Sequence, residues 1–140
     1  MSAPTAATRN AVYQRDERRC AACGVMVLTF QHRRAVGMGG SKNVPSPVDG
    51  LSLCATCNAG CEGVLQAQAL RFGWKVRRWV THPERVPVFY PLEMAWYRFE
   101  GVVRIRISRA VAMEMGCSVY GAEWLAWHEE IADATSGVTR

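Results

Sequence analysis

Two Cys-x-x-Cys pairs are the residues of this sequence best spaced for chemistry. Cys20 and Cys23 form the first pair, and Cys54 and Cys57 form the second. One such pair supplies two thiolates from a single tight turn, and two pairs complete the tetrahedral Cys₄ set of a structural zinc site. The spacing therefore predicts one structural Zn²⁺ bound by these four side chains. The alternative is that they are buried free thiols, since free cysteine behaves as a small hydrophobe.

A further cysteine, Cys61, offers an alternative fourth ligand in place of Cys57. We favour Cys57, because its short spacing from Cys54 closes a turn without looping out backbone. Metal binding at such a site is coupled to folding. We therefore expect the segment around the cysteines to lose most of its fold when the metal is removed.

Polar side chains that could do further chemistry lie between and after the two pairs. His32 follows an apolar stretch, Asp49 stands before a glycine, and Asn58 directly follows the last paired cysteine. An imidazole titrates near neutral pH, so His32 is suited to accept a proton. However, a lone histidine at a strand end is more often a hydrogen-bonded structural residue, and an aspartate before glycine is typical of a turn.

The elements that must position these side chains are short. Alternating and β-branched stretches predict strands, and longer amphipathic stretches predict helices. Residues 33–50, rich in glycine and proline, predict a loop, and a loop of this length in a compact domain is usually functional. The predicted strands cover 25–32, 51–54, 74–80, 94–100 and 102–107, and the predicted helices cover 5–19, 59–72 and 120–134.

The last of these helices carries an apolar stripe. Tyr120, Trp124, Trp127 and Ile131 recur at helical spacing. Such a stripe is most often buried in the core of the same chain. The alternative is an exposed face for a protein partner or for a second copy of the chain.

Positive charge is concentrated in the half of the chain that holds the cysteine pairs. The net charge is +5, and residues 1–80 hold eleven Lys and Arg against four Asp and Glu. A basic half is expected to attract a polyanion such as DNA, both by direct contact and by its long-range field. Ordinary solvated surface residues are the other explanation of the same charges.

Composition limits the class of protein. Apolar residues make up 49% of the chain, which is enough for a folded core. There is no run of 18 apolar residues and no apolar leader, so we expect neither a membrane span nor a secretory signal. Clustered cysteines in a reducing compartment indicate metal binding rather than disulfides. A soluble cytoplasmic protein is the expectation.

Four segments together resemble the HNH (ββα-metal) endonucleases, particularly the small phage-encoded ones. These segments are CAACG, QHRRAVGMGGS, VDGLSLC and CNAGCEG, within about residues 10–80. The most distinctive is HRRAVGMGGS, because phage members carry a similar His-Arg-Arg followed by Gly-Met-Gly-Gly. The resemblance implies an α+β fold with a zinc-stapled ββα-metal core and an N-terminal helix in residues 1–80. Short strands and a C-terminal amphipathic helix in residues 81–140 would pack on it, and the host cell would be bacterial.

The resemblance also implies roles for particular residues. The first histidine of the family motif is a general base and corresponds to His32. The central asparagine, which holds the histidine loop by hydrogen bonds, corresponds to Asp49. An aspartate accepts such bonds but cannot donate them, so this is a departure from the family pattern. Asp49 could instead raise the pKa of His32, ligate the cation, or simply begin a turn.

A catalytic divalent cation, Mg²⁺ or Mn²⁺, is implied as well. Its ligand at the last motif position corresponds to Asn58, or in a second register to Glu62, and the companion ligand corresponds to Gln31. Oxygen ligands of this kind suit Mg²⁺. In this family interpretation Arg33, Arg34 and Lys42 lie beside the base and are suited to contact DNA phosphates.

Two functions of different class follow from this resemblance. The first is a metal-dependent DNA endonuclease that nicks or cleaves phosphodiester bonds. The second is a catalytically degenerate member that keeps the zinc-stapled fold as a nucleic-acid-binding or host-protein-binding module. The departures from the family pattern favour the second function, whereas the retained His-Arg-Arg and the glycine-rich loop favour the first.

Overall fold

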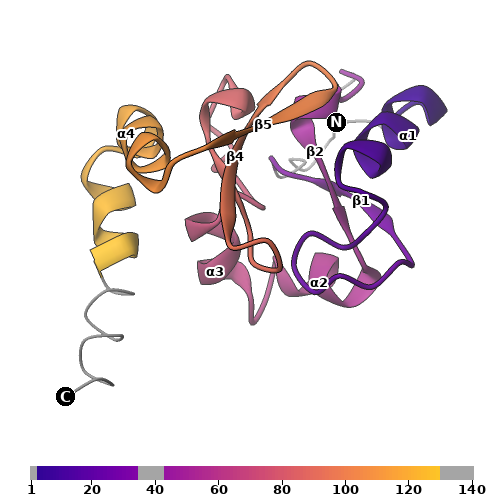
Figure 1. Cartoon of the computed structure of the whole chain (residues 1–140), viewed down its shortest axis with the longest axis horizontal. Coiled ribbons are helices and arrows are strands. Elements are labelled where there is room, and N and C mark those ends of the chain that lie inside the picture. Colours follow the sequence, from indigo (N-terminus) through magenta and orange to yellow (C-terminus); the bar gives the residue numbers. More distant parts are fainter. Residues whose placement is uncertain (1–2, 35–42, 130–140) are drawn as a thin grey trace.

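The computed structural model describes residues 3–34 and 43–129 and has a mixed α+β architecture with two small antiparallel sheets (Figure 1). A further helical stretch, residues 122–129, follows the last named helix. In chain order the elements are α1 (Ala6–Arg15), β1 (Thr29–His32), the 3-10 turn η1 (Pro47–Asp49), β2 (Gly50–Leu53), α2 (Ala55–Gly60), α3 (Gln66–Arg71), the 3-10 turn η2 (Pro83–Arg85), β3 (Val88–Tyr90), β4 (Ala95–Glu100), β5 (Val103–Ile107) and α4 (Arg109–Tyr120).

The first sheet pairs β1 with β2 and places His32 opposite Gly50. Helix α2 follows β2 directly, and α1 packs on the same hairpin. Strand β1 is shorter than the predicted 25–32. The carbonyl of Val25 accepts a hydrogen bond from the Cys20 amide at 2.8 Å, and Gly24 has φ +84°. Residues 24 and 25 therefore close the cysteine turn instead of extending the strand.

The second sheet is a meander in the order β3-β4-β5. Strands β4 and β5 confirm the strands predicted over 94–100 and 102–107 to within one residue. The strand predicted over 74–80 is wrong, since only a single bridge between Arg34 and Val76 forms there. Gly73 has φ +73° and turns the chain, and the Trp74 indole donates to the carbonyl of Phe89 at 2.9 Å.

The helix predicted over 59–72 is two helices, α2 and α3, separated by a turn. The amides of Gly63 and Leu65 both donate to the carbonyl of Gly60, which closes the turn, and glycine has low helix propensity. Helix α4 is absent from the sequence prediction. Its start is marked by Ser108, whose hydroxyl accepts a hydrogen bond from the Val111 amide at 3.1 Å, a common N-cap arrangement.

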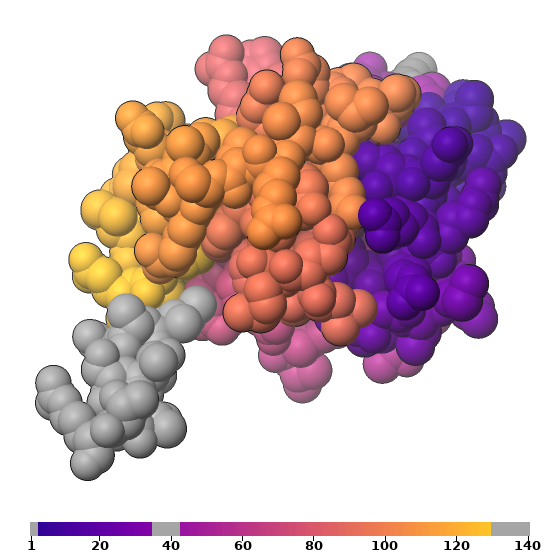
Figure 2. Space-filling view, in the orientation of Figure 1, coloured from indigo at the N-terminus to yellow at the C-terminus, as the bar shows by residue number. Residues whose placement is uncertain are grey.

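One hydrophobic cluster joins both halves of the chain. It contains Leu51 and Leu53 from the first sheet, Trp74, and Tyr90 and Phe99 from the second sheet. Residues on both sides of position 80 therefore share a core. In the space-filling view the N-terminal residues form one end of the molecule and the C-terminal helices the other (Figure 2).

The C-terminal aromatic stripe is largely core. Trp124 has no exposed surface, Tyr120 is 8% exposed, and both belong to a second cluster with Trp96. Gly116 lies flat against the Trp124 indole, where a Cβ would overlap the ring. This burial agrees with the expectation, favoured from the sequence, that Tyr120 and Trp124 pack in the core of the same chain. Trp127 packs at the edge of the same cluster, and Ile131 lies outside the described residues.

Among the described residues, no helix combines the length and apolar character that crossing a membrane requires.

Arg33 is fully buried and joins four parts of the chain. Its guanidinium donates to the carbonyls of Gly73 at 2.9 Å, Val48 at 2.9 Å, Pro83 at 3.1 Å and Val86 at 3.0 Å. Burial lowers its pKa to about 10, which leaves the group charged at neutral pH. Four hydrogen bonds from one buried charged group fix the positions of the carbonyls that accept them, because losing any of them is costly in the core.

A second buried arginine ties α1 to both sheets. Arg15 pairs with Asp16 at 2.9 Å and donates to the carbonyl of Gly50 at 2.8 Å. The Asp16 carboxylate also accepts from the Ser52 amide at 2.9 Å and from the Tyr90 hydroxyl at 2.5 Å. Asp16 therefore connects α1 to β2 and to β3 through one buried carboxylate.

Replacing Arg33 by methionine should destabilise the fold strongly. Arg33→Met removes the guanidinium donor from the carbonyls of Gly73, Val48 and Val86, whereas the Pro83 carbonyl keeps the Val86 amide. We therefore expect the free energy of unfolding to fall by about 3 kcal/mol or more. Urea denaturation followed by tryptophan fluorescence measures this change. The matched control is Arg78→Met at an exposed position, which should stay within about 0.5 kcal/mol of the parent. Equal stability of the two variants would refute the structural role of Arg33.

Candidate metal centre

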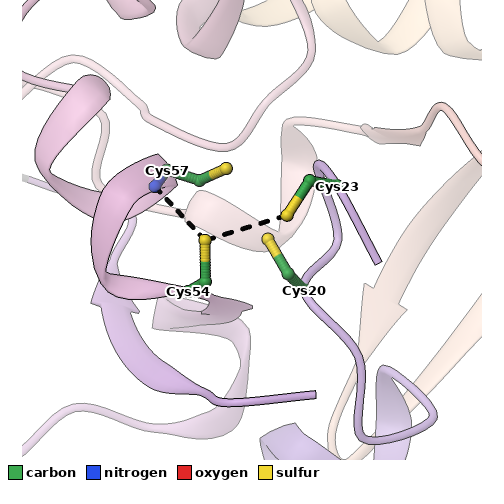
Figure 3. Close-up of side chains that lie close together, drawn as sticks. All are labelled: Cys20, Cys23, Cys54 and Cys57. Atoms are coloured by element: carbon green, nitrogen blue, oxygen red, sulfur yellow. Dashed lines mark hydrogen bonds between the residues drawn. The ribbon is translucent and has the colours of Figure 1, made fainter. Parts of the chain in front are cut away.

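Four thiols converge between the cysteine turn and the start of α2 (Figure 3). The sulfurs of Cys20, Cys23, Cys54 and Cys57 all lie within 4.8 Å of one another, and the Cys23 and Cys54 sulfurs are 3.8 Å apart. Tetrahedral Zn²⁺ with Zn–S bonds of about 2.3 Å requires sulfurs about 3.8 Å apart. In residues 3–34 and 43–129 this is the one group of three or more Cys, His, Asp or Glu side chains gathered in this way. The four thiols are placed to hold a metal ion such as zinc.

Backbone hydrogen bonds hold the two cysteine pairs in place. The first pair sits in a turn closed by the Gly24 amide, which donates to the carbonyl of Cys20 at 2.8 Å. The neighbouring Ala21 amide donates to the carbonyl of Ser52 in β2 at 2.8 Å, which fixes the turn against the first sheet. Cys54 is the N-cap of α2, and its sulfur accepts from the Cys57 amide at 3.4 Å.

The local electrostatics distinguish Cys54 from Cys61. The hydrogen bond from the Cys57 amide lowers the pKa of Cys54 to about 7, which favours the thiolate that binds metal. Burial raises the pKa of both Cys57 and Cys61, the latter to about 11, so the pKa does not choose between these two thiols. Cys61 has no exposed surface and packs in the core, outside the four-sulfur group. The group therefore contains Cys57, the preferred residue, and the identity of the fourth metal ligand stays a prediction.

His32 ends β1 and is half-buried. Its ring packs edge-on against Phe30 with centroids 5.1 Å apart, and its buried Nδ1 has no hydrogen-bond partner within residues 3–34 and 43–129. Burial lowers the pKa of His32 below its ordinary value, and the nearby charge of Asp49 opposes this shift. The neutral imidazole is therefore the favoured form at neutral pH.

Asp49 holds the end of the connection that leads back to β2. Its carboxylate accepts from the Ser46 amide at 2.8 Å and from the Ser46 hydroxyl at 3.1 Å, and its carbonyl accepts from the Arg33 amide at 2.8 Å. Ser46 was missed by the sequence analysis, although Ser-x-x-Asp is a capping-box pattern. Asp49 thus ends the 3-10 turn η1 directly before β2, instead of beginning a turn at Gly50, and lies close enough to His32 to raise its pKa.

The expected oxygen ligands of a catalytic cation have other partners. Gln31 is 5% exposed and donates to the carbonyl of Trp74 at 3.4 Å. Because successive strand side chains point to opposite faces, Gln31 and His32 face apart. Glu62 pairs with Lys75 at 2.8 Å. Gln31 and His32 therefore lie on different faces of the first sheet, and the catalytic cation site stays a prediction.

Asn58 connects α2 to the first strand. Its side-chain amide donates to the hydroxyl of Thr29 at 2.8 Å and to the carbonyl of Phe30 at 3.5 Å. The same Thr29 hydroxyl donates to the carbonyl of Leu53 at 2.7 Å. Nothing in the sequence pattern signals Thr29, because its role depends on the packing of α2 across the hairpin.

The three predicted phosphate contacts differ in their surroundings. Arg33 is completely buried, which contradicts the prediction that it contacts DNA phosphate. Its guanidinium already donates to backbone carbonyls. Arg34 is half-buried and donates to the carbonyl of Val80 at 2.8 Å. Lys42 lies outside the described residues.

No protein-family model, curated protein or solved structure matches this chain. The interpretation of the site therefore depends on its own geometry.

Metal content should follow the four clustered thiols. We expect one equivalent of zinc per chain in the purified protein and a loss of most of it in Cys57→Ser, because three thiolates bind Zn²⁺ less tightly than four. Inductively coupled plasma mass spectrometry on the two proteins measures the ratio.

Cys61→Ser and Cys117→Ser serve as matched controls, since neither thiol belongs to the four-sulfur group. Both should retain the zinc of the parent. Zinc lost from Cys61→Ser but kept in Cys57→Ser would reverse the assignment of the fourth ligand.

Proposed function

We propose that this chain is a DNA endonuclease of the HNH type, which hydrolyses phosphodiester bonds with His32 as general base. The observation that carries the proposal is the position of His32. It stands at the end of a β1–β2 hairpin followed directly by α2, next to Asp49 and in the same small unit as the four clustered cysteines. A strand that ends in a histidine, a second strand and a helix follow one another along this segment, and this order supports the proposal.

The imidazole supports this role by its charge state. Burial favours the neutral ring, and a neutral ring can accept the proton of a water that attacks a phosphate. The charge of Asp49 opposes the effect of burial and so increases the basicity of the His32 ring, while the pKa of His32 stays below its ordinary value. The chain that holds the ring is fixed on both sides, by Asn58 on Phe30 and by the Asp49 carbonyl on Arg33.

A structural zinc at the four cysteines would complete this unit. It would lock the turn that contains Cys20 to the N-terminus of α2, and so fix the helix against the strand that ends at His32. When bound, a catalytic Mg²⁺ or Mn²⁺ would stabilise negative charge on the phosphate. Gln31 and Glu62 are held by other partners. The plasmid experiment below therefore also tests which divalent cation the reaction requires.

The second candidate is a degenerate member that binds nucleic acid or a host protein without cleaving. The specific observation in its favour is that Gln31 is buried in the core and Glu62 is held by Lys75. Under this alternative the cysteine-stapled fold is kept and His32 has only a structural role.

Nicking of supercoiled plasmid with Mg²⁺ or Mn²⁺ separates the two candidates. We expect the parent protein to convert supercoiled to open-circular DNA, and His32→Ala to reduce the rate at least about a hundredfold, as loss of a general base typically does. Agarose-gel densitometry over time gives both rates.

His82→Ala is the matched control, because His82 is exposed and pairs only with Glu84 among the described residues. It should nick at the parental rate. Salt-sensitive DNA binding without nicking in any divalent metal would favour the binding module instead. Equal rates in His32→Ala and His82→Ala would remove His32 from the mechanism.

A further inference from the structure

A second site lies between the three-stranded sheet and the C-terminal helices. A cavity of about 560 Å³ opens there, within the size range of small-molecule sites. None of the side chains discussed for the endonuclease lines it. Its walls include Phe72, Phe89, Trp96, Ile107, Arg109 and His128.

Aromatic rings dominate one side of this cavity. The ring centroids of Phe72 and Phe89 are 4.8 Å apart, and those of Phe89 and Trp96 are 5.2 Å apart. All three rings line the same space. Such a surface is suited to stack or pack against a planar aromatic group, since aromatic pairs prefer tilted and offset arrangements at these separations.

A buried polar group without a partner lies in the same cavity wall. His128 is 6% exposed, and its buried Nε2 has no hydrogen-bond partner among the described residues. Its ring lies against two indoles, 4.5 Å from the Trp124 centroid and 5.7 Å from the Trp96 centroid. Because Nε2 has no accessible surface, a ligand in the cavity would contact the edge of the His128 ring and not this nitrogen.

The opposite rim is positively charged. Arg109 is the first residue of α4, is exposed, and forms no ion pair among the described residues. The N-terminus of α4 carries the positive end of a twelve-residue helix, which favours anions. Ser108, the N-cap, lines the cavity beside Arg109. The rim is therefore suited to a negatively charged group.

We propose that this cavity binds a small planar aromatic molecule that carries an anionic group. The ring lies among Phe72, Phe89 and Trp96 and beside the His128 imidazole, and the anion lies at Arg109 and the start of α4. A mononucleotide and an aromatic carboxylate share this chemistry. Binding here does not depend on phosphodiester cleavage by the His32 site.

Isothermal titration calorimetry on the full chain tests the proposal with two matched pairs of probes. The pairs are indole-3-acetate with indole-3-acetamide, and adenosine monophosphate with adenosine. We expect the anionic member of at least one pair to bind at least about tenfold more tightly than its neutral partner, as a charge-assisted contact provides. The pair that responds distinguishes a carboxylate ligand from a nucleotide.

Arg109→Gln should remove most of this preference and leave the affinity for the neutral probe unchanged. Arg78→Gln, an exposed arginine that does not line the cavity, is the matched control and should bind as the parent does. Near-ultraviolet circular dichroism verifies that both variants are folded. In the parent, addition of the bound probe should shift the His128 imidazole signals in the proton NMR spectrum.

Two results would overturn the proposal. One is the absence of saturable binding for all four probes. The other is binding that is equally tight in Arg109→Gln, or that leaves the His128 signals unmoved, since either would place the ligand elsewhere. Neither result bears on plasmid nicking, which tests the endonuclease separately.

Discussion

The Phe99 ring lies between two buried guanidinium groups, 3.6 Å from that of Arg15 and 5.0 Å from that of Arg33. Each guanidinium is also bound to carbonyls in the connection that leads into β2. Phe99 belongs to β4, so these contacts attach the cysteine-bearing hairpin to the second sheet. Buried charges tolerate little displacement, because any lost hydrogen bond leaves a desolvated group unpaired. The arginines therefore fix the geometry of the chain on both sides of His32.

The cysteine group and the buried arginines act on the same hairpin from opposite ends. The cysteines join the turn before β1 to the helix after β2, while Arg33 continues β1 beyond His32 and fixes its far end. Each end of the hairpin is also held by an aspartate. Asp16 binds the backbone of β2, and Asp49 binds the turn that precedes β2. A small sheet of two strands has little stability by itself. These polar attachments explain how so short a hairpin can hold an imidazole in one position.

The two proposed sites are built from different parts of the molecule. The His32 site uses backbone and side-chain bonds around a two-stranded sheet, and its imidazole keeps a buried nitrogen without a partner. The cavity beside His128 uses aromatic walls from the second sheet and the positive end of α4. In both places a histidine ring has one buried nitrogen without a hydrogen-bond partner among the described residues. The two sites lie in different layers of one fold and share no side chain.

The spacing of the cysteines determined the four-sulfur group, because a Cys-x-x-Cys turn is a local structure whose geometry depends on few neighbours. The alternation of apolar residues likewise determined β4 and β5. The tertiary structure alone decided the role of Arg33. The sequence predicted that it contacts phosphate, but in the core it is surrounded by carbonyls from distant segments of the chain. The tertiary structure also gathered the walls of the aromatic cavity from segments far apart in the chain. Charge and residue type are visible in a sequence, but burial and hydrogen-bond partners depend on chain segments brought together only by folding.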